Sequence, residues 1–369
     1  MIKRHSWIPI LSSLIAALIG GYLFQLLHIP VPWLLGPMAF VLICSSFFPS
    51  RFTWYGPFRT GSMIIVGYTI GLSLTGAALK EIGRQLPFML LMTSLLLLLC
   101  AGIAFIVSKV SRTDFKTALM GAIPGGLTQV LILAEETGGI NMTVVTITQV
   151  IRLMMIVICI PLLVFSPLFD HVNVDGIVQA ALPEAAAKAS WSGLFPNAVW
   201  YAAVCILFAY AGRKVKLPTA FLLGPVIGAA LLQGLGVTGP GLPVSITDAA
   251  QLSIGIFVGL MLKPGQLPNK TRTLLVAIGS GLLLLLAAIL LSLLLTLIRP
   301  VSAATGLLSL APGGADQMGI IAHEIGADLS IVAGYQLFRT FFILIAFPPL
   351  WRLLFVRKKS KNTAEQGEA

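Results

Sequence analysis

Two stretches of the chain repeat one another: IPGGLTQVLILAEETGGINMTVVTITQVIR at residues 123–152 and APGGADQMGIIAHEIGADLSIVAGYQLFR at residues 311–339. Each sets a Pro-Gly-Gly triplet inside an apolar run, continues with a glutamine and an acidic cluster, and ends on a Gln-x-x-Arg motif. Helix-breaking residues and a deeply placed arginine are costly in a membrane unless they face protein or water. Because the sequence keeps this combination twice, we expect a ligand to bind there.

The composition places the chain in a membrane. Of its 369 residues, 57% are hydrophobic and 10% are charged, and the mean hydropathy is +0.97, whereas about 25% of residues are charged in soluble domains. Runs of about 20 apolar residues, enough for a helix to cross a hydrocarbon core of about 30 Å, recur along the chain. Membrane barrels alternate apolar and polar residues instead, so we predict an all-α integral membrane protein.

The net charge of +11 does not indicate a nucleic-acid partner. The basic residues lie in short loops and in the tail at residues 357–361, which are the places that orient a membrane protein. The four cysteines lie singly inside apolar segments and predict neither a disulfide framework nor a metal site.

The apolar runs predict ten spanning helices and two broken segments. In the first half the spans are Trp7–Leu27, Trp33–Phe48, Gly61–Leu79, Leu86–Val107 and Met142–Phe165, and the broken segment is Thr117–Glu136. In the second half the spans are Ser192–Ala211, Ala220–Leu235, Ala249–Leu262, Leu274–Ile298 and Leu329–Leu354, and the broken segment is Thr305–Glu324.

The two halves keep a common register, which indicates an internal duplication. The tetrapeptide Leu-Leu-Gly-Pro at 34–37 returns at 222–225, and the Pro-Gly-Gly triplet returns at the same offset. One deletion then shifts the offset by a single residue before the Gln-x-x-Arg motifs. We divide the chain into membrane repeat 1 (1–168), a linker (169–190), membrane repeat 2 (191–355) and a basic, polar tail (356–369).

Basic loops alternate out of phase in the two halves. They follow the second and fourth spans in the first half, and the first and third spans in the second half. Because cytoplasmic loops are enriched in Lys and Arg, we predict two inverted repeats with both termini in the cytoplasm. This requires five crossings per repeat, with the Pro-Gly-Gly segment re-entering from one side; alternatively, the short Leu-Leu-Gly-Pro span does not cross.

Inverted repeats with broken helices are typical of secondary transporters, which bind their substrate where the breaks meet. A break frees carbonyl groups on one side and N–H groups on the other, and these favour cations and anions respectively. The alternative is a kink that serves packing alone. The predicted substrate-binding residues are Pro124, Gly125, Gly126, Gln129, Gln149, Arg152, Pro312, Gly313, Gly314, Gln317, Gln336 and Arg339.

Each Gln-x-x-Arg motif places its two side chains on one helix face. Each arginine lies roughly 15 Å along its span, where a guanidinium needs a carboxylate, carbonyl dipoles or an anionic ligand. We favour an anionic group of the substrate as the partner of Arg152 and Arg339. The alternative is an ion pair with Glu136 or Glu324 that only joins helices.

The acidic residues near the breaks are candidates for coupling to H⁺ or Na⁺. They are Glu136, Asp316, Glu324 and Asp328. Glu324 matches Glu136 in the duplication, while Asp316 is interpreted first as a cap of the new half-helix and second as an ion ligand. We interpret His323 as a polar helix-end residue or proton partner. The scattered histidines give no metal site.

Small residues elsewhere are interpreted as packing devices. The Gly-Pro pairs at 36–37 and 224–225 are expected to break the short second spans. Glycines spaced four apart in the next span of each half are expected to let helices approach closely; they are Gly67, Gly71, Gly255 and Gly259.

The duplicated PGG…Q…E…G…QxxR core resembles the AbrB-duplication family of bacterial inner-membrane proteins, over essentially the whole chain. The resemblance implies two copies of that family's repeat and a location in the inner membrane. Members are often labelled transcriptional regulators or ammonia monooxygenases. The sequence contains neither a soluble DNA-binding segment nor a metal cluster, so it supports neither label.

We therefore expect a secondary active transporter that moves a small organic, anionic solute by alternating access, coupled to H⁺ or Na⁺. The sequence lacks the common hydrolase and nucleotide-binding motifs, so we expect no enzyme activity, cofactor or metal. The expected partners are the solute, the coupling ion and membrane lipid, and a homo-oligomer is left open. The alternatives are a membrane regulator or sensor that does not transport, and a passive channel.

Overall fold

The computed structural model describes residues 7–125, 127–137, 139–164, 197–262, 270–351 and 355. Residues 127–129, 132, 136 and 270–273 are described by their backbone alone. The predicted linker at 169–190, the tail at 356–369 and Gly126 lie outside the described residues, as do the side chains of Gln129 and Glu136.

The described residues are all-helical, as predicted, with fourteen α-helices and one short 3-10 helix. The first half contains α1 (Trp7–Leu26), α2 (Pro32–Phe47), η1 (Pro49–Arg51), α3 (Gly56–Ser73), α4 (Gly76–Ser111), α5 (Phe115–Ala122), α6 (Leu127–Thr137) and α7 (Met142–Val164). The second half contains α9 (Asn197–Lys214), α10 (Ala220–Gly234), α11 (Val244–Gly259), α12 (Lys270–Ile298), α13 (Ala303–Leu310), α14 (Ala315–Glu324) and α15 (Leu329–Trp351).

Five of these helices, α1, α4, α7, α12 and α15, are long and apolar enough to cross a membrane. Their outer faces carry exposed large apolar side chains, such as Leu98 on α4 (68% exposed) and Leu297 on α12 (84% exposed). Such a surface is stable against lipid and not against water. The protein is therefore a multi-pass membrane protein.

Several predicted boundaries and both predicted Gly-Pro breaks are wrong: α3 and α11 begin five residues before the predicted Gly61 and Ala249. Helix α4 begins at Gly76 and not at Leu86, because the Thr75 hydroxyl caps it by accepting a hydrogen bond from the Ala78 N–H at 3.2 Å. The Gly-Pro pairs do not interrupt α2 or α10, which continue through Pro37 and Pro225. Each proline lies close to the helix start, so its missing N–H removes one early hydrogen bond and the helix continues.

The two predicted broken segments are hairpins of half-helices, α5–α6 and α13–α14. The outer ends of each hairpin meet, because the Asn141 N–H donates to the Thr117 hydroxyl at 3.2 Å and the Asp328 N–H to the Thr305 hydroxyl at 3.1 Å. The half-helices have 8 to 11 residues, about 12 to 16 Å at 1.5 Å per residue. Each is about half the thickness of a membrane core.

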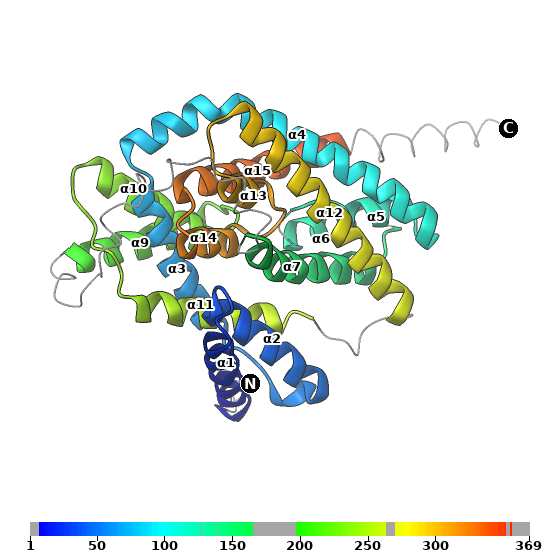
Figure 1. Ribbon diagram of the computed structural model, residues 1–369, viewed down its shortest axis with the longest axis horizontal. Coiled ribbons are helices and arrows are strands. Elements are labelled where there is room, and N and C mark those ends of the chain that lie inside the picture. The colour runs from blue at the N-terminus through cyan, green and yellow to red at the C-terminus, as the bar shows by residue number, and fades with distance from the viewer. Residues whose placement is uncertain are drawn as a thin grey trace.

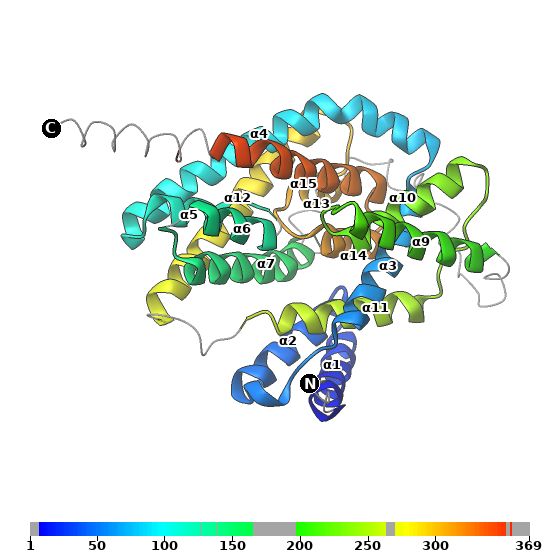
Figure 2. The same cartoon turned by 180° about the vertical axis from the view of Figure 1, so that it is seen from behind.

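The helices form two groups, and each group takes helices from both halves of the chain. We name them bundle A, which contains α1, α2, α3, α9, α10 and α11, and bundle B, which contains α4 to α7 and α12 to α15. Figure 1 shows α4 along the top of the molecule with other helices of bundle B beneath it, and α1 and α2 projecting from the opposite side; Figure 2 shows the same division from behind. Helices from both halves of the sequence thus pack side by side in each bundle.

Exchange between the halves defines bundle A. Helix α3 of the first half packs on α10 of the second, and α11 of the second packs on α2 of the first. A Cβ atom on Gly67 would lie 2.5 Å from the Leu222 carbonyl oxygen, and one on Gly255 would lie 2.5 Å from the Leu34 carbonyl oxygen. These glycines permit the close approach, which confirms the predicted packing role.

The main contacts between the bundles are made by α3 of bundle A with α14 and α15 of bundle B. A cluster of buried apolar residues, here named the shared cluster, takes members from both bundles, including Val66 and Ile70 on α3 and Met318 and Ile321 on α14. A second cluster lies within bundle B and includes Leu133 of α6. The second helix break therefore lies at the interface between the bundles.

Candidate functional site

The first Gln-x-x-Arg motif binds the end of α5. Arg152 donates from Nη1 to the carbonyl oxygens of residues 121–123 at 3.1 to 3.3 Å. Gln149 donates from Nε2 to the carbonyl oxygens of Met120 and Ile123 at 2.8 and 3.0 Å. The two side chains are joined because Arg152 Nη2 donates to Gln149 Oε1 at 2.6 Å.

The second motif repeats this arrangement at the end of α13. Arg339 donates from Nη1 to the carbonyl oxygens of Leu310 and Ala311 at 3.3 and 2.8 Å, and from Nη2 to that of Gly313 at 3.1 Å. Gln336 donates from Nε2 to the carbonyl oxygens of residues 308, 309 and 311, and its Oε1 accepts from Arg339 Nη2.

Tight turns follow both half-helices at the predicted prolines. After Pro124, the Gly125 N–H donates to the Ile123 carbonyl at 2.9 Å. After Pro312, the Gly313 N–H donates to the Ala311 carbonyl at 2.8 Å. Both halves thus place the same turn and the same hydrogen-bond network at the break.

Arg152 and Arg339 bind carbonyl groups. The sequence had left three kinds of partner open: a carboxylate, carbonyl dipoles or an anionic ligand. The last carbonyl groups of a helix have no partner within the helix and carry its negative end. Arg152 and Arg339 are each 4% exposed, so each buried guanidinium neutralises such an end. Among the ion pairs of the described residues, none joins Arg339 to Glu324, whose carboxylate accepts from Gln251 Nε2 at 2.6 Å. A role of the arginines in substrate binding stays a prediction.

Asp316 lies in the first turn of α14, whose N-cap residue is Gly314 and not Asp316. Its carboxylate accepts hydrogen bonds from the backbone N–H groups of Asp316 and Gln317 and from Gln317 Nε2 at 3.1 Å. A Cβ on Gly314 would lie 1.9 Å from Gln317 Oε1 and 2.5 Å from Asp316 Oδ1. Glycine therefore makes room for two converging side-chain oxygens, and Gln317 Oε1 has no hydrogen-bond partner in the described part of the chain.

Arg59 on α3 is close enough to Asp316 on α14 for their charges to interact. Its guanidinium lies 3.8 Å from the ring centroid of Phe257 on α11, and its charge attracts Asp316 without a direct ion pair. Arg59 enters the sequence-based interpretation only as a basic loop residue. Its counterpart in the second half is Thr247, so the duplication gives no signal for it.

A cleft between the bundles lies farther along α3 and α14, and neither Arg59 nor Asp316 is among its lining residues. It lies between α3, α11 and α14, and its polar lining residues are Thr69, Thr247, Gln251 and His323. Glu324 accepts the hydrogen bond from Gln251 at its edge. Asp248 is near enough to Glu324 for the two carboxylates to repel each other. Of this set, the sequence indicated His323 and Glu324 only.

Asp328 has a structural role at the start of α15. Its Oδ1 accepts from the backbone N–H groups of Ser330 and Ile331 at 3.0 Å each, as an N-cap residue does. In the first half, Asn141 Oδ1 accepts from the Val144 N–H at 3.1 Å. Because asparagine does the same work, the position needs no charge, and the geometry gives no support to a coupling role.

A family model described as "Transition state regulatory protein AbrB" matches residues 33–355. The chain belongs to the AbrB family. YhjN of Bacillus subtilis (strain 168) is 26% identical over 374 residues, which cover 95% of this chain and 95% of that protein. "Putative regulator AbrB" of Escherichia coli (strain K12) is 25% identical over 337 residues, which cover 90% and 92%. No solved structure matches the chain. The family resemblance noted from the duplicated core is thus confirmed.

Proposed function

We propose that this AbrB family protein is a secondary active transporter of a small organic anion in the bacterial inner membrane. It works by alternating access and is coupled to H⁺ or Na⁺. Its two repeats lie inverted, each with five crossings and one re-entrant hairpin, and both termini are cytoplasmic. The solute binds between bundles A and B.

The observation that carries this proposal is the division into two bundles with a helix break at their junction. Alternating access needs two packed bodies that move against one another around a binding site. Bundles A and B meet chiefly through α3, α14 and α15, and the cleft opens at that junction. The ends of the half-helices α13 and α14 lie at this junction, and carriers with interrupted helices bind their substrate at such breaks.

The two breaks support the repeat architecture. Both motifs donate to corresponding carbonyl groups of their half-helices, so the hairpins are two copies of one unit. Their surroundings differ, because α14 contacts α3 whereas α6 packs against α5 and α7. A carrier caught in one state of its cycle has this property: equivalent elements with unequal contacts.

The second candidate is a membrane regulator, which the printed names of the family and of the Escherichia coli relative favour. In that case the cleft binds a ligand, and a change in the contact between α3 and α14 passes the signal to a partner. No flux would accompany binding.

A cross-link between the bundles tests the proposal. The Ser330 hydroxyl donates to the Ser73 carbonyl oxygen at 2.7 Å across the junction, so Ser73→Cys with Ser330→Cys, in a background without the four native cysteines, places two thiols within reach of a short cross-linker. We expect the cross-link to abolish gradient-driven uptake of labelled small carboxylates by proteoliposomes, and its cleavage to restore uptake.

The matched control joins two positions inside bundle A. Trp54 Nε1 donates to the Ser253 hydroxyl at 3.0 Å, so Trp54→Cys with Ser253→Cys is cross-linked in the same way and should leave uptake intact. Unchanged uptake after cross-linking Ser73→Cys with Ser330→Cys would contradict the moving-bundle mechanism. Absence of flux under every proton and sodium gradient would favour the regulator.

A further inference from the structure

We propose that Arg59 and Asp316 form a proton-linked anion site, in which Arg59 binds the carboxylate of the solute while Asp316 carries a proton. This inference rests on the proposed function and names the binding group and the coupling ion. It assigns the site to a pair of residues from opposite bundles, which the sequence duplication does not reveal.

Arg59 is the available cation at the junction. It is half-buried, and the face of Phe257 holds its guanidinium plane at 3.8 Å. Within the described part of the chain it forms neither a hydrogen bond nor an ion pair, unlike Arg152 and Arg339, whose donors are taken up by carbonyl groups. A guanidinium with free donors binds a carboxylate through two parallel hydrogen bonds.

Asp316 and Gln317 form half of an acid–amide pair. Gln317 Nε2 donates to Asp316 Oδ2 at 3.1 Å, while Gln317 Oε1 and Asp316 Oδ1 converge above Gly314. Gln317 is 5% exposed, and within the described residues its Oε1 has no hydrogen-bond partner, which is unfavourable in a buried position. A proton on Oδ1 supplies the missing donor and completes the pair.

The charge of Asp316 affects how strongly Arg59 can bind the carboxylate of the solute. Asp316 is 9% exposed, and in the described residues Arg59 is the charged group that acts on it. Two other helices contribute side chains nearby. Arg339 of α15 donates from Nη2 to the Gly313 carbonyl oxygen, and α11 contributes the apolar ring of Phe257. An ionised Asp316 therefore competes with the solute carboxylate for Arg59, and protonation removes the competitor.

The cleft indicates the remainder of the solute. Its apolar lining comes from Ile65, Val66 and Ile70 on α3 and Ile320 on α14, and Arg59 lies about two turns earlier on α3. A carboxylate bound by Arg59 would need an apolar body that extends about 9 Å along α3 to reach the first of these residues, Ile65. Its binding takes up one proton, so its affinity falls about tenfold for each pH unit once Asp316 ionises.

The test measures binding of small straight-chain carboxylates, from propionate to octanoate, to the purified full-length protein. Binding is followed as thermal stabilisation relative to sodium chloride, at about pH 5.5 and about pH 8. We expect tighter binding at the acidic pH. Arg59→Gln should lose binding at both pH values, Arg59→Lys should retain part of it, and Asp316→Asn should bind equally at both.

Two matched controls keep a similar charge change away from the pair. Arg51→Gln removes an arginine that also lies over an aromatic ring, that of Phe48 at 5.6 Å. Asp114→Asn changes an acid at the start of α5 whose capping bond to the Lys116 N–H asparagine can replace. Both should bind like the wild type.

Three results would overturn the site: no carboxylate binds at either pH, Arg59→Gln binds like the wild type, or Asp316→Asn keeps the pH dependence. Infrared spectroscopy reports the proton itself, because the carboxylic acid C=O band should vanish in Asp316→Asn and titrate at higher pH in Arg59→Gln. Circular dichroism identifies any variant that fails to fold.

Failure of the site and failure of the carrier are distinguishable. Arg59-dependent binding without gradient-driven flux in proteoliposomes would keep the site and remove the transport function. Proton-driven flux that is the same in wild type and Arg59→Gln would keep the transporter and remove the site.

Discussion

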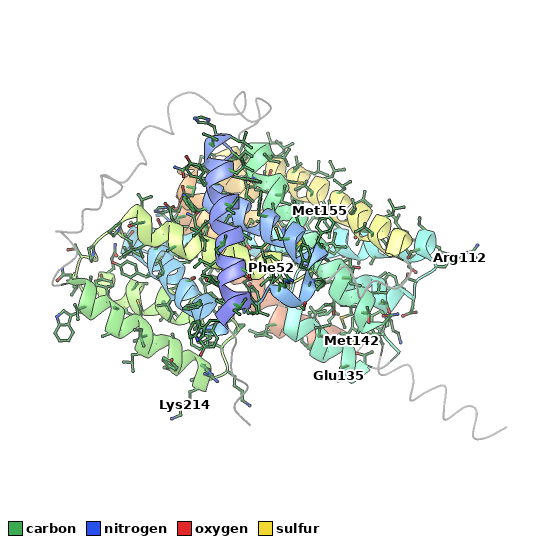
Figure 3. The ribbon with its side chains drawn as sticks, turned by 90° about the horizontal axis from the view of Figure 1, so that it is seen from below. Phe52, Arg112, Glu135, Met142, Met155 and Lys214 are labelled. Atoms are coloured by element: carbon green, nitrogen blue, oxygen red, sulfur yellow. The ribbon has the colours of Figure 1, made fainter. Side chains whose placement is uncertain are left out.

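The two helix breaks share their internal structure and differ in what surrounds them. In both, an arginine and a glutamine bind the last carbonyl groups of the first half-helix. The α6 hairpin packs within bundle B, and Figure 3 shows Glu135 near the end of α6 beside Met142 at an edge of the molecule. The corresponding end of α14 carries His323, which lines the cleft against bundle A.

The groups that stabilise a helix break can therefore be told apart from groups that could bind a ligand at it. The shared network is needed wherever a helix stops inside a membrane, since its carbonyl groups have no water to bind. The charged pair of Asp316 with Arg59 exists at the second break only, because the first half has Thr128 at the position of Asp316 and the second half has Thr247 at that of Arg59. In the described residues the two breaks thus share their hydrogen-bond networks, while the charges of Asp316 and Arg59 belong to the second break.

The largest expected effect tests whether the two networks are equivalent. Arg152→Gln and Arg339→Gln each leave three carbonyl groups of a half-helix without their charged donor. We expect each change to lower the free energy of unfolding by about 3 to 5 kcal/mol, measured by denaturant titration in detergent, with Lys substitutions intermediate. A lower free energy of unfolding in one variant and an unchanged value in the other would show that the two networks are not equivalent.

A smaller effect is expected where the halves exchange helices. Gly67→Ala and Gly255→Ala each direct a Cβ at a backbone carbonyl oxygen 2.5 Å away, which a main chain cannot easily avoid. We expect each to lower the free energy of unfolding by about 1 to 3 kcal/mol. The matched control is Gly102→Ala in α4, where a Cβ meets nothing within 4 Å, and which should stabilise its helix by about 0.5 to 1 kcal/mol.

The smallest effect concerns the two caps. Asn141→Ala and Asp328→Ala remove the side chains that accept from the first turns of α7 and α15, so each should lower the melting stability by about 1 kcal/mol. Asp328→Asn makes the second cap identical to the first and should change stability and flux little. If it abolished proton-driven flux instead, Asp328 would regain the coupling role predicted from the sequence.

Patterns within a single segment were predictable. The Pro-Gly-Gly triplets end α5 and α13 at the expected places, because proline removes a donor and glycine adopts the turn. The breaks predicted at the two Gly-Pro pairs were wrong. The effect of a proline depends on its distance from the helix start, and α2 and α10 begin only a few residues before Pro37 and Pro225. The start of α4 was missed because Thr75, a single capping residue, outweighed the hydropathy minimum around Lys80.

The sequence by itself determined that the chain is a helical membrane protein and where its two Pro-Gly-Gly segments break. These properties follow from apolar run length and backbone chemistry, both of which are local. Only the tertiary structure decided that the halves exchange helices into bundles A and B, that the buried arginines bind carbonyl groups, and that Arg59 lies close to Asp316. Those outcomes depend on packing between segments far apart in the chain, where shape and burial select the partners of each side chain.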